Sequence, residues 1–158
     1  MEKKKKGSRT KTESRNLHYE TDGDVNNVIF GTVFQTIRKG LGLTQDDISM
    51  MSGWTDATIS RIETGRTSIN LESLVLLALF LEMEPHELFA VFDESRRVIF
   101  NSVTSSQSFA ELFNKSGLFG RQEKNLRLMS QMFKPMISEV VDRTVFLPLE
   151  DGTDCSKK

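Results

Sequence analysis

The sequence predicts an all-α protein with a compact five-helix domain. Apolar residues recur at helical spacing, a capping residue precedes most of the apolar runs, and strand-like alternation is missing from residues 25–92. We therefore divide the chain into three parts. Residues 1–24 are predicted to be a disordered basic arm, residues 25–92 the five-helix domain, and residues 93–158 a helical C-terminal extension with a disordered tail.

The first helix of the domain is predicted to begin at Asn26 or Asn27, because either side chain can cap a helix. Gly40 and Gly42 predict where it ends. Its apolar residues recur every three or four positions and predict one buried stripe. The residues of this stripe are Phe30, Val33, Phe34, Ile37 and Leu41.

The second helix is predicted to be short and to lead into a tight turn. Thr44 can cap it by accepting the backbone N–H of Asp47, and Ile48 and Met51 are expected to face inward. Gly53 follows about two turns later, where a sharp turn needs a left-handed backbone.

The remaining helices of the domain have equally local signals. Thr55 is predicted to cap the third helix and Gly65 to stop it, Asn70 to cap the fourth, and Pro85 to open a short fifth helix. The residues expected to face inward from these helices are Ile59, Ile62, Leu71, Leu74, Val75, Ala78, Leu81, Leu88, Phe89 and Phe92.

The helical signal weakens after residue 93. Residues 97–100 are interpreted as a short strand or linker, residues 101–108 as a loop, and residues 109–113 as a short helix. A longer helix is predicted from about residue 121 to residue 143, kinked or split by Pro135. Its apolar face has no evident partner in the chain, so we expect a dimer or partner interface there.

Charge is distributed unevenly along the chain, whose net charge is −1. Residues 1–15 hold seven basic and two acidic residues, whereas residues 25–92 hold four basic and eight acidic ones. Attraction to phosphate supplies much of the affinity of DNA-binding proteins, so an acidic domain must depend on its local potential. The run of lysines at residues 3–6 is either a DNA-contacting arm or a solubilising one.

Several classes of protein are not indicated. The only cysteine, Cys155, excludes an internal disulfide, and the chain has no metal-ligand cluster, nucleotide loop or nucleophile motif. We expect no enzyme, no cofactor and no metal. Residues 93–158 are expected to be too few for an enclosed ligand pocket. Without a signal peptide or a membrane span, the expected location is the cytoplasm.

A helix-turn-helix signature runs through the predicted second and third helices. Its fixed positions are occupied by Leu43, Thr44, Gln45, Gly53, Ile59, Ser60, Glu63 and Gly65. These residues resemble the lambda-repressor-like, Xre-type helix-turn-helix family of transcriptional regulators. The resemblance covers roughly residues 28–90, with Ile48 and Ser49 where Leu and Ala are usual. It implies a lambda-repressor-like DNA-binding domain of bacterial or phage origin.

The resemblance also implies a set of DNA contacts, with the third helix in the major groove. The residues expected to read bases are Thr55, Asp56, Ala57, Ser60 and Arg61. The residues expected to contact phosphates are Arg38, Lys39, Gln45, Trp54, Thr58, Arg66 and Thr67. Gln45 is also expected to brace the third helix. The alternative for Arg61 is an exposed ion pair with Glu63 or Asp56.

The sequence therefore predicts a sequence-specific regulator that binds double-stranded DNA, most simply a homodimeric repressor that recognises an inverted repeat. The alternative is an antitoxin or anti-regulator. That protein would bind a partner protein through residues 93–158 and autoregulate through its DNA-binding domain.

Overall fold

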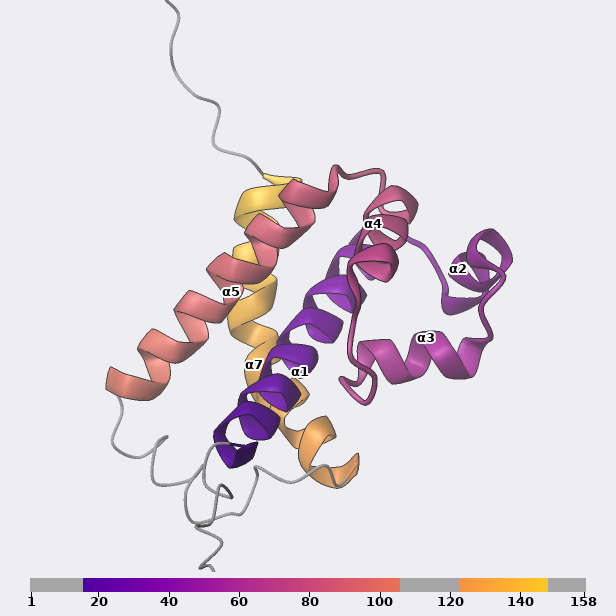
Figure 1. Cartoon of the computed structure of the whole chain (residues 1–158). Helices are drawn as coiled ribbons and strands as arrows, with labels where there is room; N and C mark the ends of the chain where they lie inside the picture. Colours follow the sequence, from indigo (N-terminus) through magenta and orange to yellow (C-terminus); the bar gives the residue numbers. More distant parts are fainter. Residues whose placement is uncertain (1–15, 106–122, 148–158) are drawn as a thin grey trace, which may run out of the picture.

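The computed structural model describes residues 16–105 and 123–147, and every element in these ranges is helical (Figure 1). The all-α prediction is therefore confirmed for this part of the chain. The elements are α1 (Asn16–Gly40), α2 (Gln45–Ser52), α3 (Asp56–Glu63), α4 (Leu71–Phe80), α5 (Pro85–Ser105), α7 (Glu123–Val141) and the π-helix η1 (Asp142–Phe146). The lysine run, the helix predicted at residues 109–113 and the tail lie outside the described residues.

The long helix α1 is the centre of the fold. It packs against α3, α5 and α7, while α4 packs against α2 and α5. Figure 1 shows α5 and α7 on one side of α1 and the α2–α3 pair on the other. The predicted stripe on α1 is buried at Phe30, Val33, Phe34 and Ile37, whereas Leu41, at the end of the helix, is 43% exposed.

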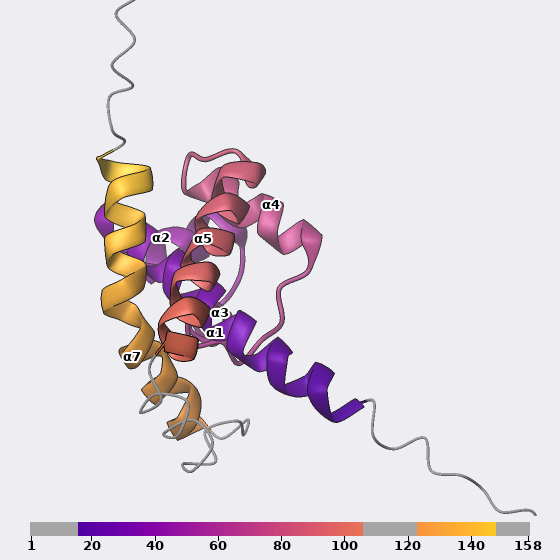
Figure 2. The same ribbon diagram turned by 90° about the vertical axis from the view of Figure 1, so that its left-hand side faces the viewer.

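The predicted start of α1 is wrong. The helix begins at Asn16, so residues 16–24, assigned to the arm, are helical, and their turns project beyond the other helices (Figure 2). The reason is that the buried stripe extends back to Val25, and a helix propagates easily once its first turn exists. Asn27 does not cap the helix, and its side-chain amide donates to the Ser68 hydroxyl at 3.3 Å.

Helix α5 is much longer than predicted. It starts at Pro85, as expected, but continues for 21 residues to Ser105. The strand or linker predicted at residues 97–100 is therefore wrong, and so is the part of the predicted loop from residue 101 to Ser105. Leu88, Val91 and Ile99 are buried on one face at helical spacing, which keeps the chain helical through the apolar segment. The boundary predicted between residues 92 and 93 falls inside this helix.

Helix α7 occupies most of the predicted range and is not split by Pro135. The proline is exposed, so its missing N–H falls on the solvent side of the helix. Its apolar face is buried against α1 and α5, which corrects the expectation that this face lacks a partner in the chain. The most deeply buried residues are Met129, Phe133, Ile137, Val140 and Val141. This packing removes the observation that favoured an interface within residues 93–158.

Some inward-facing predictions for the shorter helices are also wrong. Met51, Leu71, Val75 and Phe89 are exposed, with Leu71 at 77%, and Leu77 is buried instead. Nearly every residue of α4 is apolar, so spacing alone does not select its buried face. The predicted caps of α2, α3 and α4 are confirmed, as at Asn70, where Oδ1 accepts the backbone N–H of Ser73 at 2.7 Å.

Candidate nucleic-acid interface

The start of α2 is fixed by a reciprocal pair of hydrogen bonds. The Thr44 hydroxyl accepts the backbone N–H of Asp47 at 3.1 Å, and the Asp47 carboxylate accepts the backbone N–H of Thr44 at 2.7 Å. The same carboxylate accepts the Thr44 hydroxyl at 2.6 Å. The hydrogen bonds from the Thr44 side chain and then its backbone lower the pKa of Asp47 below its ordinary value. The predicted cap at Thr44 is confirmed, and the reciprocal bond to Asp47 completes a capping box.

The turn between α2 and α3 depends on Gly53. Its φ of 69° is left-handed, and its N–H donates to the Ser49 carbonyl at 2.9 Å. No atom lies within 4 Å of the position that a Cβ would take, so a larger side chain would not clash there. Glycine is favoured because of the left-handed backbone conformation. The Ser49 hydroxyl then donates to the Trp54 carbonyl at 2.6 Å, which ties α2 to the residue that precedes the cap of α3.

Helix α3 has one buried and one exposed face. Thr55 caps it by accepting the backbone N–H of Thr58 at 3.2 Å, as predicted. Ile59 and Ile62 are buried as expected, at 0% and 3% exposed. Of the residues expected to contact bases, Thr55, Asp56, Ala57 and Arg61 are exposed, and Ser60 is half-buried. The structure therefore places these side chains together at one surface.

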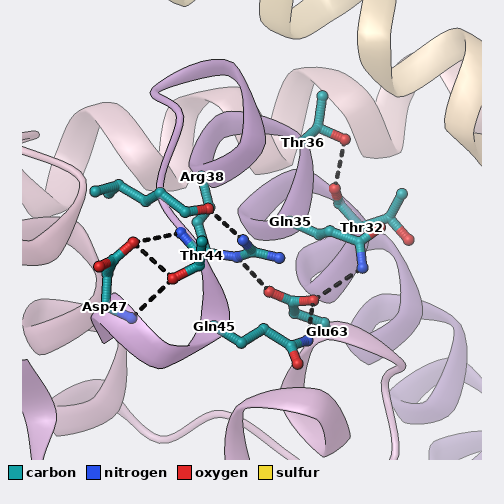
Figure 3. Close-up of polar contacts among 9 residues, drawn as sticks. Thr32, Gln35, Thr36, Arg38, Thr44, Gln45, Asp47 and Glu63 are labelled. Carbon is teal, nitrogen blue, oxygen red and sulfur yellow. Dashed lines mark hydrogen bonds and ion pairs between the residues drawn. The ribbon is translucent and has the colours of Figure 1, made fainter. Parts of the chain in front are cut away.

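The orientation of α3 is set by a buried carboxylate. Glu63, the last residue of α3, is 2% exposed and accepts three side-chain hydrogen bonds (Figure 3). The donors are Arg38 Nε at 2.6 Å and Gln35 Nε2 at 2.8 Å, both from α1, and Gln45 Nε2 at 2.7 Å, from the first turn of α2. One acidic side chain thus connects α1, α2 and α3.

Helix α3 also approaches the backbone of α1 closely. A Cβ on Gly31 would clash with the carbonyl oxygens of Ile62 and Glu63, the second of which lies only 2.8 Å from its position. Glycine at this position lets the end of α3 lie directly on α1. Together with the Glu63 hydrogen bonds, this contact fixes the buried face of α3 and leaves the opposite face free for a ligand.

Arg38 is not available for a phosphate contact, and its assignment is corrected. It is 4% exposed, and besides Glu63 it donates from Nη1 to the Leu43 carbonyl. Because Glu63 is buried in this pair, the alternative of an exposed ion pair between Arg61 and Glu63 is also wrong. The sequence contained a signal for the burial of Glu63, which follows Ile59 by four residues and Ile62 by one, on the inward side of the helix.

The other residues expected to contact phosphates differ in their exposure to solvent. Lys39 and Arg66 are exposed, and Trp54, Thr58 and Thr67 are half-buried. Trp54 packs against the hydrophobic core. Gln45 is half-buried, and its hydrogen bond to Glu63 is the expected brace between α2 and α3.

A protein-family model matches part of the chain. The helix-turn-helix family model matches residues 34–88, a range that begins within α1 and ends within α5. The match supports a DNA-binding regulator. No curated protein and no solved structure matches the chain significantly. None of the helices in the described residues is long and apolar enough to cross a membrane.

Proposed function

We propose that this protein is a sequence-specific DNA-binding repressor that inserts α3 into the major groove. The observation that carries the proposal is the exposed face of α3, where Asp56, Ala57 and Arg61 lie opposite the buried Ile59 and Ile62. A helix of this kind, held at the surface by a second helix and a tight turn, fits the width of the major groove.

The exposed residues of α3 have complementary roles in this proposal. Arg61 can donate two hydrogen bonds to a guanine, and Asp56 can accept one from a cytosine amino group. A carboxylate in the groove is repelled by phosphates, so Asp56 penalises sites without that partner. Lys39 and Arg66 contribute contacts to phosphates, which position the protein without selecting a sequence.

The proposal includes a dimer that recognises an inverted repeat. Its support is an apolar stripe on α4, formed by Leu71, Val75 and Leu79 at intervals of four residues, with exposures of 77%, 36% and 60%. Beside the stripe lies a groove of about 300 Å³ between α1, α4 and α5, lined in part by Phe30, Phe89 and Phe92. A second copy would remove this apolar surface from water.

Selection from random DNA with the full chain tests the function. We expect an enriched sequence with two-fold symmetry, since each α3 of a dimer reads one half-site. Arg61→Ala is expected to relax the preference at one position per half-site and to weaken binding by about 1–3 kcal/mol. The control Arg97→Ala removes an exposed arginine from α5 and should leave the selected sequence unchanged. If no sequence is enriched, the proposal is wrong.

Phosphate contacts have a different signature. Lys39→Ala is expected to weaken binding evenly across DNA sequences and to reduce the slope of log affinity against log salt by about one. A change in sequence preference in this variant would contradict the assignment of Lys39.

A further inference from the structure

A cavity of about 630 Å³ lies where the α4–α5 turn, α5 and η1 meet. Buried Leu81 and Val91 are among its lining residues, and Leu41, Met83, Val145 and Phe146 provide further apolar lining. This volume is in the range of pockets that hold small organic molecules. The sequence suggested that residues 93–158 are too few to enclose a pocket. Here residues from both 41–91 and 93–158 line a cavity that is partly open to solvent, and η1 contributes one wall.

Two uncommon backbone features border this cavity. The first is η1 itself, since π-helical turns are rare and occur frequently at functional sites. The second is Glu82, whose φ of 55° makes it the only non-glycine residue with positive φ among the described residues. It ends α4 in the left-handed conformation of a helix cap, in which the N–H of Met83 donates to the Ala78 carbonyl at 3.0 Å.

The wall formed by η1 is held against the end of α1. The ring of Phe146 packs directly over Gly40, the last residue of α1, where a Cβ would clash with it. The Thr144 hydroxyl donates to the Val140 carbonyl at 2.6 Å, which joins η1 to the last turn of α7. The apolar lining is therefore built from two regions that are far apart in the sequence.

The charged residues that line the cavity are all acidic. They are Glu82, Glu87 and Glu94, and the last two lie on one face of α5 with Ala90 and Val91. Glu94 already has two partners, Arg97 at 3.0 Å and Arg143 at 2.8 Å. The Glu87 carboxylate accepts the backbone N–H of Glu84 at 2.8 Å. Within the described part of the chain, neither Glu82 nor Glu87 has a basic partner.

We propose that this cavity binds an organic cation with an apolar body. The apolar part lies against Leu41, Val145 and Phe146, and the cationic nitrogen lies near Glu82 and Glu87. An anionic ligand would be repelled by these carboxylates, and a second copy of the same surface would bring like charges together. The site is separate from the exposed face of α3, so this proposal does not depend on DNA binding.

Three probes of nearly equal shape test the proposal with the full chain. They are 4-phenylbutylammonium, the neutral 4-phenylbutanol and the anionic 4-phenylbutanoate, and binding is followed by the amide chemical shifts of the ¹⁵N-labelled protein. We expect saturable shifts at residues that line the cavity, with affinity decreasing from the cation to the alcohol to the anion. Equal affinity for all three probes, no saturation at millimolar concentration, or shifts confined to another surface would overturn the proposal.

Variants separate the charges from the apolar cavity. The double substitution Glu82→Gln and Glu87→Gln is expected to weaken the cation roughly two- to tenfold and to leave the alcohol unchanged, since each partly exposed charge contributes modestly. Glu72→Gln, the same charge change on α4 outside the cavity, should have no effect. Ala90→Trp fills the cavity from an exposed position and should abolish binding of all three probes. Its amide spectrum should show that the protein remains folded. Retained binding in this variant would contradict the site.

Discussion

Arg38 and Glu63 are 25 residues apart in the chain, and their side chains form a buried ion pair with 2.6 Å between Nε and Oε1. The pair joins the centre of the fold to the end of α3. Glu63, a residue of the helix-turn-helix signature, therefore has a structural role. It supports the exposed face of α3, which we propose contacts DNA.

Loss of the Glu63 charge is expected to destabilise the whole domain. Glu63→Gln leaves Arg38 buried without a counter-charge, which costs about 3–5 kcal/mol in the free energy of unfolding. Urea unfolding measures this loss. The control Glu94→Gln removes the partner of two exposed arginines and should cost about 1 kcal/mol or less. Equal losses in the two variants would show that the buried pair has no special role.

The turn at Gly53 is expected to resist substitution for a conformational reason. Gly53→Ala places a Cβ in open space but in the left-handed region, so we expect a loss of about 1–2 kcal/mol in the free energy of unfolding. Gly53→Asn should lose less, because asparagine adopts this conformation more readily. If the alanine and asparagine variants are both as stable as the unchanged protein, the left-handed turn is not the cause of the preference for glycine at this position.

The capping box is expected to be visible in the titration of Asp47. The hydrogen bonds with Thr44 lower the pKa of the Asp47 carboxyl group in the folded protein. The charged carboxylate therefore stabilises the fold at pH values above the ordinary aspartate pKa. This stabilisation is lost as the pH falls through the lowered pKa. In Thr44→Val, which lacks the hydroxyl hydrogen bonds, the Asp47 pKa measured by NMR should rise toward its ordinary value. An unchanged pKa would contradict the assigned cause.

The apolar stripe on α4 is expected to control association. Leu79→Glu places a charge on the proposed dimer surface, so sedimentation velocity should show a shift from dimer to monomer. Leu128→Glu is the matched control, because Leu128 is 43% exposed on α7. A dimer that persists in the Leu79 variant but dissociates in the Leu128 variant would move the interface to the C-terminal helix.

Local features of the helix-turn-helix unit were predictable because they depend on nearby residues. The caps at Thr44, Thr55 and Asn70 each need a side-chain oxygen and a backbone N–H three residues later. The turn at Gly53 needs only a residue that tolerates a left-handed backbone. The sequence therefore determined the tight turn, the starts of α2, α3 and α4, and the exposure of Asp56, Ala57 and Arg61.

Tertiary packing decided the features that depend on distant segments. The apolar face of α7 is buried because α1 and the extended α5 supply its partners, as the 2.9 Å contact between the hydroxyls of Thr32 and Ser130 illustrates across 98 residues. Spacing placed Glu63 on the inward side of α3, but only the fold revealed that Arg38 is its partner and is removed from solvent. A periodic pattern identifies a face that must be covered, whereas the covering element depends on the packing of the whole chain.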